Sequence, residues 1–177
     1  MRILLIGKAG AGKDTVADYL AAGYGFIGLS FAAKLKEIAK EMFPGLWVTD
    51  RRAMLQALGM KFREIEEGVW VDYVVRQVDG IDRAVITDCR YENEYHRCKE
   101  EGFIAVKIGC GDDIRAERLF KRDGRHMTPA ELSHISEQLV VPFDYYLDNN
   151  GDEEFLHKQI DEMLERISRK MMEGEHE

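Results

Sequence analysis

A glycine-rich loop that ends in lysine constrains this chain more than any other feature of its sequence. Residues 7–13 read Gly-Lys-Ala-Gly-Ala-Gly-Lys and match the pattern G-x-x-x-x-G-K. The run Arg2–Ile6, apolar after its first residue, precedes the loop and predicts a strand covered on both faces. Small and apolar residues at helical spacing follow from 13 to 22, and Gly23 stands where we expect that helix to end. Strand, loop and helix in this order favour a phosphate-binding loop over a plain turn.

The chemistry of the loop supports this interpretation. Glycines let the backbone wrap closely around phosphate oxygens, so that N–H groups and the N-terminus of the following helix point at the anion. Lys13 stands in the first turn of that helix, where a positive charge is unfavourable unless an anion compensates it. We therefore expect Lys13 to bridge the β- and γ-phosphates of ATP. The ATP-binding residues predicted here are Gly7, Lys8, Ala9, Gly10, Ala11, Gly12, Lys13, Asp14 and Thr15.

The loop departs from the usual pattern in one place. Asp14 occupies the position where Ser or Thr normally follows the lysine, and Thr15 comes one residue later. Two roles for Asp14 stay open: it stabilises the helix N-terminus, or it reaches the metal or the acceptor.

The rest of the chain alternates between strand and helix patterns. Further strands are predicted at 26–29, 83–88, 103–108 and 145–147. Helices are predicted around 35–42 (ended by Pro44-Gly45), 50–58 (closed by Gly59), 70–78, 93–101 and 112–122, from a capping box at Thr128–Glu131, and from 156 to 171. This alternation predicts an α/β fold with a central parallel sheet, helices on both sides and right-handed crossovers.

The composition fits one domain and excludes some partners. A chain of 177 residues with 45% hydrophobic content can bury the core of one ordinary domain. No apolar run approaches the ~20 residues that span a bilayer, so we expect no membrane association. The net charge of −8 argues against binding a nucleic acid polymer, but allows small phosphorylated ligands at a local cation cluster. The three cysteines and five histidines lack metal-ligand or disulfide spacing, which fits a cytoplasmic protein.

An acid and a base follow the predicted strand 83–88. Ligands of open α/β sheets bind beyond the carboxyl ends of the strands, where Asp88 and Arg90 are expected. Asp88 could hold Mg²⁺ through water, and Arg90 could grip a phosphate with two hydrogen bonds. The alternative is that Asp88 caps a turn while Arg90 pairs with Glu94 on the surface.

A helix rich in cations begins near residue 112. Arg118 and Arg122 are four residues apart, so they share one face and could close on the transferring phosphates. The alternative is a surface helix in which Glu117 pairs with Lys121. The helix and the segment after it have the character of a lid over residues 112–140.

Two motifs resemble a known family. The run Gly12-Lys-Asp-Thr15 resembles the G-K-G-T ending of adenylate kinases and, more closely, the G-K-D-T of bacteriophage-type deoxynucleoside monophosphate kinases. The stretch from Asp88 to Glu94 resembles the D-x-R-F-x-N-E segment of the same phage kinases, and the resemblance extends from Gly7 to Gly151. It implies a three-layer P-loop NTPase fold with a helical NMP-binding insertion (about 31–79), a small lid (about 112–140) and a core formed by about 1–30, 80–110 and 143–177. It also implies ATP-dependent phosphorylation of a (deoxy)nucleoside monophosphate.

The resemblance also implies roles for single residues. Thr15 would join Asp88 at Mg²⁺, and Asn149 would lie against the adenine of ATP. The catalytic residues would be Lys13, Arg90, Arg118 and Arg122. The acceptor would be bound by Ser30, Lys34, Gln56, Arg63, Trp70, Asp88, Arg90 and Glu94. Trp70 is alternatively a core residue, and Lys34 part of a solvated helix face.

Other functions stay open at this stage. A P-loop kinase with another acceptor, such as dephospho-coenzyme A or phosphomevalonate, would share much of this pattern. A regulatory protein that binds ATP without transferring phosphate would share the loop, but it has no need for arginines that clamp a second phosphate. The expected partners are small nucleotides, and the chain is expected to be a monomer or a homodimer.

Overall fold

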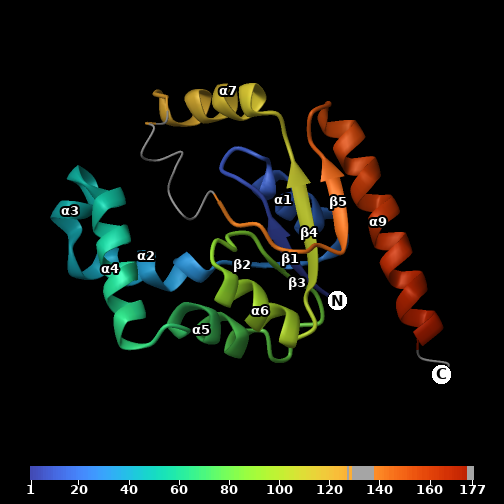
Figure 1. The fold of residues 1–177 in the computed structure, drawn as a ribbon, viewed down its shortest axis with the longest axis horizontal. Helices are drawn as coiled ribbons and strands as arrows, with labels where there is room; N and C mark the ends of the chain where they lie inside the picture. Colours follow the sequence, from blue (N-terminus) through green and yellow to red (C-terminus); the bar gives the residue numbers. More distant parts are fainter. Residues whose placement is uncertain (127, 129–137, 175–177) are drawn as a thin grey trace.

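A computed structural model describes residues 1–126, 128 and 138–174. Its centre is a five-stranded sheet in the order β2-β3-β1-β4-β5, and all strand pairs are parallel (Figure 1). The strands are β1 (Arg2–Ile6), β2 (Ile27–Leu29), β3 (Ala84–Ile86), β4 (Ile104–Gly109) and β5 (Tyr145–Asp148). The predicted α/β fold with a parallel sheet is therefore confirmed.

Helices cover both faces of the sheet. Ile3 and Leu5 of β1 pack in one core with α1 (Lys13–Tyr24) and α9 (Glu153–Gly174). Leu4 and Ile6 face the opposite way and pack in a second core with α5 (Val69–Gln77) and α6 (Glu92–Glu100). Because successive side chains of a strand alternate between faces, burial on both sides requires an unbroken apolar run. This is why β1 was recognisable from its sequence.

The order of the strands brings two loops together at one edge of the sheet. From β1 the chain passes through α1 to β2, whereas from β3 it passes through α6 to β4, across β1. Since β1 and β3 are neighbours and their connections run in opposite directions, their carboxyl ends form the switch point where ligands of such sheets bind. The glycine-rich loop follows β1, and Asp88 follows β3 at this same edge.

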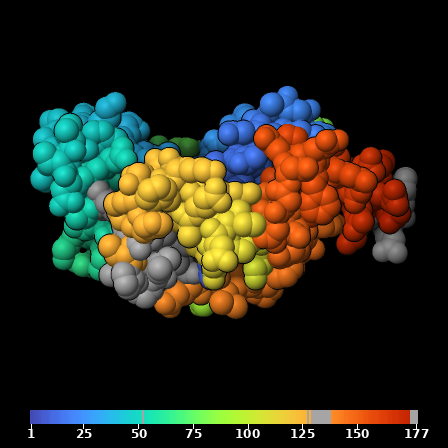
Figure 2. Space-filling view, turned by 90° about the horizontal axis from the view of Figure 1, so that it is seen from above, coloured from blue at the N-terminus to red at the C-terminus, as the bar shows by residue number. Residues whose placement is uncertain are grey.

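Four helices lie between β2 and β3. They are α2 (Phe31–Met42), α3 (Pro44–Thr49), α4 (Arg51–Ile65) and α5, and α2–α4 project to one side of the sheet (Figure 1). Figure 2 shows a notch between this cyan insertion and the blue region around α1, with α7 (Asp112–Asp123) in front. The notch opens above the switch point of the sheet.

Three predicted helix boundaries are wrong. Pro44 does not simply end a helix but begins α3, because the first turn does not need the N–H that proline lacks. Gly59 does not close α4, which continues to Ile65. A Cβ at Gly59 would lie 3.2 Å from Leu35 Cδ2, so this glycine allows α4 to pack closely on α2. The helix after the loop ends not at Gly23 but at Gly25, whose φ of 70° suits glycine.

Helix α7 lies above the carboxyl ends of the strands (Figure 1). It begins directly after β4 and ends at Gly124. The predicted capping box after it lies outside the described residues, apart from Thr128. In the part of the chain that the structure describes, no helix is long and apolar enough to cross a bilayer.

Candidate active site

The glycine-rich loop has the backbone conformation that its glycines permit. Gly10 and Gly12 have φ values of 77° and 98°, in the left-handed region that other residues rarely adopt. The Nζ of Lys13 donates hydrogen bonds to the carbonyl oxygens of Gly7 (2.6 Å) and Lys8 (3.1 Å). The ammonium group is thus held against the loop that the sequence predicts to bind phosphate.

Asn149 fixes the loop from the opposite end of the chain. This side chain is 5% exposed, follows β5, and donates from Nδ2 to the carbonyl oxygen of Ala11 at 2.8 Å. Arg118 Nη2 donates to Asn149 Oδ1 at 3.4 Å, and Arg118 Nη1 lies 3.5 Å from the Sγ of Cys110. The structure therefore brings together two residues, Asn149 and Arg118, that the sequence assigned to ATP and to catalysis.

Arg122 lies further along α7 and is engaged by its neighbour. Its Nε and Nη2 donate to the two carboxylate oxygens of Asp123 at 2.7 and 2.8 Å. This pairing raises the pKa of Arg122, and the negative charge of Asp14 contributes to the same shift. Asp14 is exposed in the first turn of α1, close enough to influence the lid arginine. To bind a phosphate, Arg122 would have to leave Asp123.

Two other loop residues have simpler surroundings. Lys8 lies 3.8 Å from Asp112 of α7, and both side chains are largely exposed. Thr15 is half-buried in the first turn of α1. These positions agree with a loop that presents groups to a ligand from one side and packs under α7 on the other.

Arg115 was missed as a functional residue by the sequence analysis. It is 5% exposed, and its Nε donates to the carbonyl oxygen of Ala9 at 2.9 Å. The sequence does carry one signal, because Leu119 stands four residues later and shares its helix face. An apolar residue at that spacing indicates that the face points inward.

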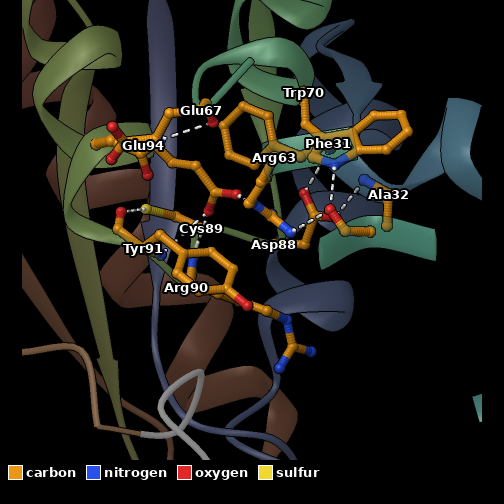
Figure 3. A network of polar contacts seen from close by, with 12 residues as sticks. Phe31, Ala32, Arg63, Glu67, Trp70, Asp88, Cys89, Arg90, Tyr91 and Glu94 are labelled. Carbon is orange, nitrogen blue, oxygen red and sulfur yellow. Dashed lines mark hydrogen bonds and ion pairs between the residues drawn. The ribbon is translucent and has the colours of Figure 1, made fainter. Parts of the chain in front are cut away.

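Asp88 caps α2 from across the site. Its Oδ1 accepts the N–H of Phe31 (2.9 Å), and its Oδ2 accepts the N–H of Ala32 (3.0 Å) and the hydroxyl of Ser30 (2.7 Å). Figure 3 shows this carboxylate facing the start of α2. Ser30 occupies the N-cap position, but its hydroxyl makes no capping bond. The capping alternative is thus realised on a helix instead of a turn.

Glu94 is buried and serves two partners. Its Oε1 accepts a hydrogen bond from Arg63 Nη2 at 3.0 Å, and its Oε2 accepts the backbone N–H groups of Arg90 (2.8 Å) and Tyr91 (3.1 Å) (Figure 3). Burial raises the pKa of Glu94, and the N–H of Arg90 and the charge of Arg63 oppose that shift. Because both oxygens already accept bonds from the protein, Glu94 is placed to hold Arg63 and the loop, not to reach a ligand itself.

Most of the predicted acceptor residues meet in one place. A small pocket of about 60 Å³ between α2, α4, α5 and the loop after β3 is lined by Phe31, Ala32, Leu35, Arg63, Trp70, Asp88, Arg90, Tyr91 and Glu94. The guanidinium of Arg63 lies 4.2 Å from the ring centroid of Tyr91, a residue that no sequence pattern marked. Trp70 is 4% exposed and packs on Phe62, so it belongs to the core and to the pocket wall.

Two predicted acceptor residues lie apart from this pocket. Lys34 pairs with Glu37 at 2.8 Å on the surface of α2, which raises the pKa of Lys34. Gln56 is exposed on α4. Neither lines the pocket.

A larger cavity of about 930 Å³ lies on the other side of the loop, beneath α7. Its described walls come from the start of the loop, the end of β4, α7 and residues 138–140. It includes Lys8 and Lys107 but none of the residues predicted for the acceptor. The two hollows flank the loop.

The surroundings of Asp88 fit Mg²⁺ held through water better than direct ligation. A carboxylate offers about four acceptor positions, and three protein donors already use its oxygens. One water of a hydrated ion could occupy the position that remains. Mg²⁺ at kinase sites usually keeps several waters and takes its other ligands from substrate phosphates. Thr15 and Asp88 together fit such a site.

Comparisons with known proteins agree with the fold and narrow the chemistry. The sequence model of a family described as AAA domain matches residues 3–140. A protein of Acanthamoeba polyphaga mimivirus, provisionally named a deoxynucleotide monophosphate kinase, is 26% identical over 204 residues, which covers 93% of this chain and 96% of the relative.

Solved structures of kinases share the fold at low identity. A gluconokinase from Sinorhizobium meliloti 1021 has a TM-score of 0.67 at 19% identity, over 97% of this chain and 95% of its own. A shikimate kinase from Acinetobacter baumannii, solved with shikimate, has a TM-score of 0.62 at 15% identity, over 96% and 93%. Because the named acceptors of these proteins differ, the fold alone does not identify the acceptor of this chain.

Proposed function

Because the chain belongs to the AAA domain family and has the fold of P-loop kinases, we propose that it transfers the γ-phosphoryl group of ATP to a nucleoside monophosphate, most readily a deoxynucleotide. The mimivirus relative, similar over nearly the whole length of both chains, supports this acceptor class. The proposed setting is the cytoplasm, with the chain as a monomer or a homodimer.

The observation that carries the proposal is the pair of cation groups at neighbouring strand ends. Lys13 follows β1, and Arg90 follows β3, which pairs with β1. Arg63 joins Arg90 at the acceptor pocket, where the buried carboxylate of Glu94 holds it. A guanidinium held in this way presents its remaining N–H groups in a fork that matches phosphate oxygens. Two anionic substrates can therefore meet at the switch point.

Phosphoryl transfer then requires positioning and charge neutralisation more than covalent help. Lys13 would bind the β- and γ-phosphates, and Arg118 and Arg122 would approach them from α7. A monophosphate acceptor is already ionised near neutral pH, so its oxygen attacks without a general base. Mg²⁺, when bound near Thr15 and Asp88, would neutralise the phosphate oxygens that it bridges.

The acceptor would be held by its phosphate and by its base. Arg63 and Arg90 would bind the phosphate, and Trp70 and Tyr91 would form an aromatic wall for the base. Lys34 and Gln56 would contribute only after the insertion moves toward the core. Domain closure of this kind is common among kinases.

Coupled ADP release with a panel of acceptors tests the proposal. The panel comprises the deoxy- and ribonucleoside monophosphates, gluconate, shikimate, dephospho-coenzyme A and phosphomevalonate. We expect turnover with one or more monophosphates, and none in the Lys13→Ala variant, whose circular dichroism spectrum should match that of the parent. Turnover confined to gluconate, shikimate or the other two compounds would contradict the acceptor. ATP binding with no acceptor-dependent ADP release would indicate a regulatory protein instead.

A further inference from the structure

Arg115 is a buried cation at the outer side of the glycine-rich loop. Most cations of α7 are exposed, yet Arg115 is 5% exposed. Its Nε donates to the carbonyl oxygen of Ala9 at 2.9 Å, and its Nη1 donates to Asp112 Oδ1 at 2.5 Å, one helical turn earlier. Arginine is almost never this buried unless it is paired, because its charge is costly to remove from water. The pairing with Asp112 therefore keeps the guanidinium in place beneath α7.

This contact fixes the direction of one peptide group. In a planar trans peptide the C=O and the following N–H point in opposite directions. When Arg115 binds the oxygen of Ala9, the N–H of Gly10 is turned away from α7. Asn149 acts on the next peptide but one, since it binds the oxygen of Ala11 and so directs the N–H of Gly12 away from itself.

The close approach of α7 to the loop depends on the absent side chain of Gly10. A Cβ at Gly10 would lie 3.0 Å from both the carbonyl oxygen of Arg115 and the Cγ of Leu119. The loop is therefore packed directly against the helix. Arg118, one turn after Arg115 on the same helix, contacts Asn149.

We propose that Arg115 is a positioning residue, which orients the Ala9–Gly10 peptide so that its N–H faces the phosphates of ATP. This inference rests on the proposed function only in assuming that the loop binds ATP, and it is independent of the acceptor. It also makes α7 and the loop one unit, because Arg115 and Arg118 fix two of the loop peptides, the second through Asn149. Phosphate binding and the position of the lid helix are then coupled.

Binding measurements without any acceptor test this role. We compare the affinities of inorganic tripolyphosphate and of adenosine, by calorimetry and by NMR titration, in the parent and in Arg115→Met. Losing a hydrogen bond from a charged donor should weaken tripolyphosphate binding about tenfold or more, and adenosine binding should be unchanged. Arg115→Lys keeps the charge and one donor and should recover part of the loss.

Two controls separate positioning from general damage to the helix. Lys121→Met removes an exposed cation of α7 that pairs only on the surface with Glu117 at 2.6 Å among its printed contacts, so both affinities should stay at the parental values. A variant Arg115→Met that melts like the parent and binds tripolyphosphate equally well would overturn the proposal. An equal loss for adenosine and tripolyphosphate would also overturn it, because a disordered helix would affect both.

If Arg115→Met does not fold, Asp112→Asn decides. The side chain of Asp112 is 79% exposed, so its replacement leaves the core intact but removes the acceptor that holds Arg115. Removal of an acidic charge beside the loop should by itself favour an anion. Weaker binding of tripolyphosphate therefore supports positioning through Arg115, and unchanged or tighter binding contradicts it.

Discussion

Gly12 shows how a single position can depend on both conformation and space. Its φ of 98° is strained for alanine, and a Cβ there would lie 2.0 Å from Asn149 Nδ2. We predict that Gly12→Ala loses the ATP-dependent rise in melting temperature, because Asn149 must release Ala11. Gly80→Ala is the matched control, since Gly80 has a φ of 78° but nothing within 4 Å. Both variants should carry the backbone strain of about 1–2 kcal/mol, and only Gly80→Ala should keep ATP binding.

Glu94 leads to a second prediction at the scale of one residue. In Glu94→Gln the neutral amide cannot match the charge of Arg63 while accepting two backbone N–H groups. We expect the KM for the nucleoside monophosphate to rise about tenfold and the KM for ATP to stay unchanged. An equal rise in both KM values, measured by coupled ADP release, would argue against a role specific to the acceptor.

The raised pKa of Glu94 gives this prediction a pH dependence. The folded protein binds a proton at Glu94 more readily than the unfolded chain, so this group's contribution to the unfolding free energy falls as pH rises from the unfolded pKa to the folded one. The ion pair with Arg63 forms above the folded pKa. The acceptor KM of the parent should therefore rise as pH falls through that pKa. Glutamine does not titrate, so subtracting the variant's profile removes the titration of the acceptor phosphate.

Residue roles were predictable from the sequence only where the chemistry is local. Lys13 and the glycines were recognisable because the motif lies within one stretch of chain. Glu94 and Asp88 were assigned to the ligand, whereas the structure shows them binding Arg63 and the start of α2. Their partners are distant in sequence, and no local pattern reveals which donors a buried carboxylate will meet.

At the scale of elements, Asp88 links β3 to α2. It satisfies two backbone N–H groups that the first turn of a helix leaves without partners. We predict that Asp88→Ala lowers the unfolding free energy by about 1–2 kcal/mol, as loss of a helix cap does. Urea denaturation would measure this change. Ser30→Ala removes a donor to Asp88 but leaves the cap, so it should cost clearly less, and equal losses would contradict the capping role.

The elements themselves were predictable where burial is two-sided or the helix is amphipathic. The strands at β1, β3 and β4 were recognised from their apolar runs. The extension of α4 through Gly59 was not, because it depends on the packing of that glycine against Leu35. Packing between helices distant in sequence overrides the local preference of glycine to end a helix.

At the scale of the molecule, strand order decides where chemistry can occur. The alternation of strands and helices predicted a parallel sheet, but the order β2-β3-β1-β4-β5 and the switch point between β1 and β3 came from the structure. That order places the loop after β1 next to the residues after β3. It also leaves the insertion α2–α4 on one side and α7 above, so both can approach the same edge (Figure 1).

The central claim is that one site binds two phosphorylated substrates side by side. Calorimetry with a bisubstrate analogue, adenosine joined to a deoxynucleoside through a polyphosphate chain, tests it most directly. We predict a 1:1 complex tighter than that of ATP or the monophosphate alone, weakened by Lys13→Ala and by Arg63→Ala separately. An analogue that binds no more tightly than ATP, with an affinity unchanged by Arg63→Ala, would contradict the account.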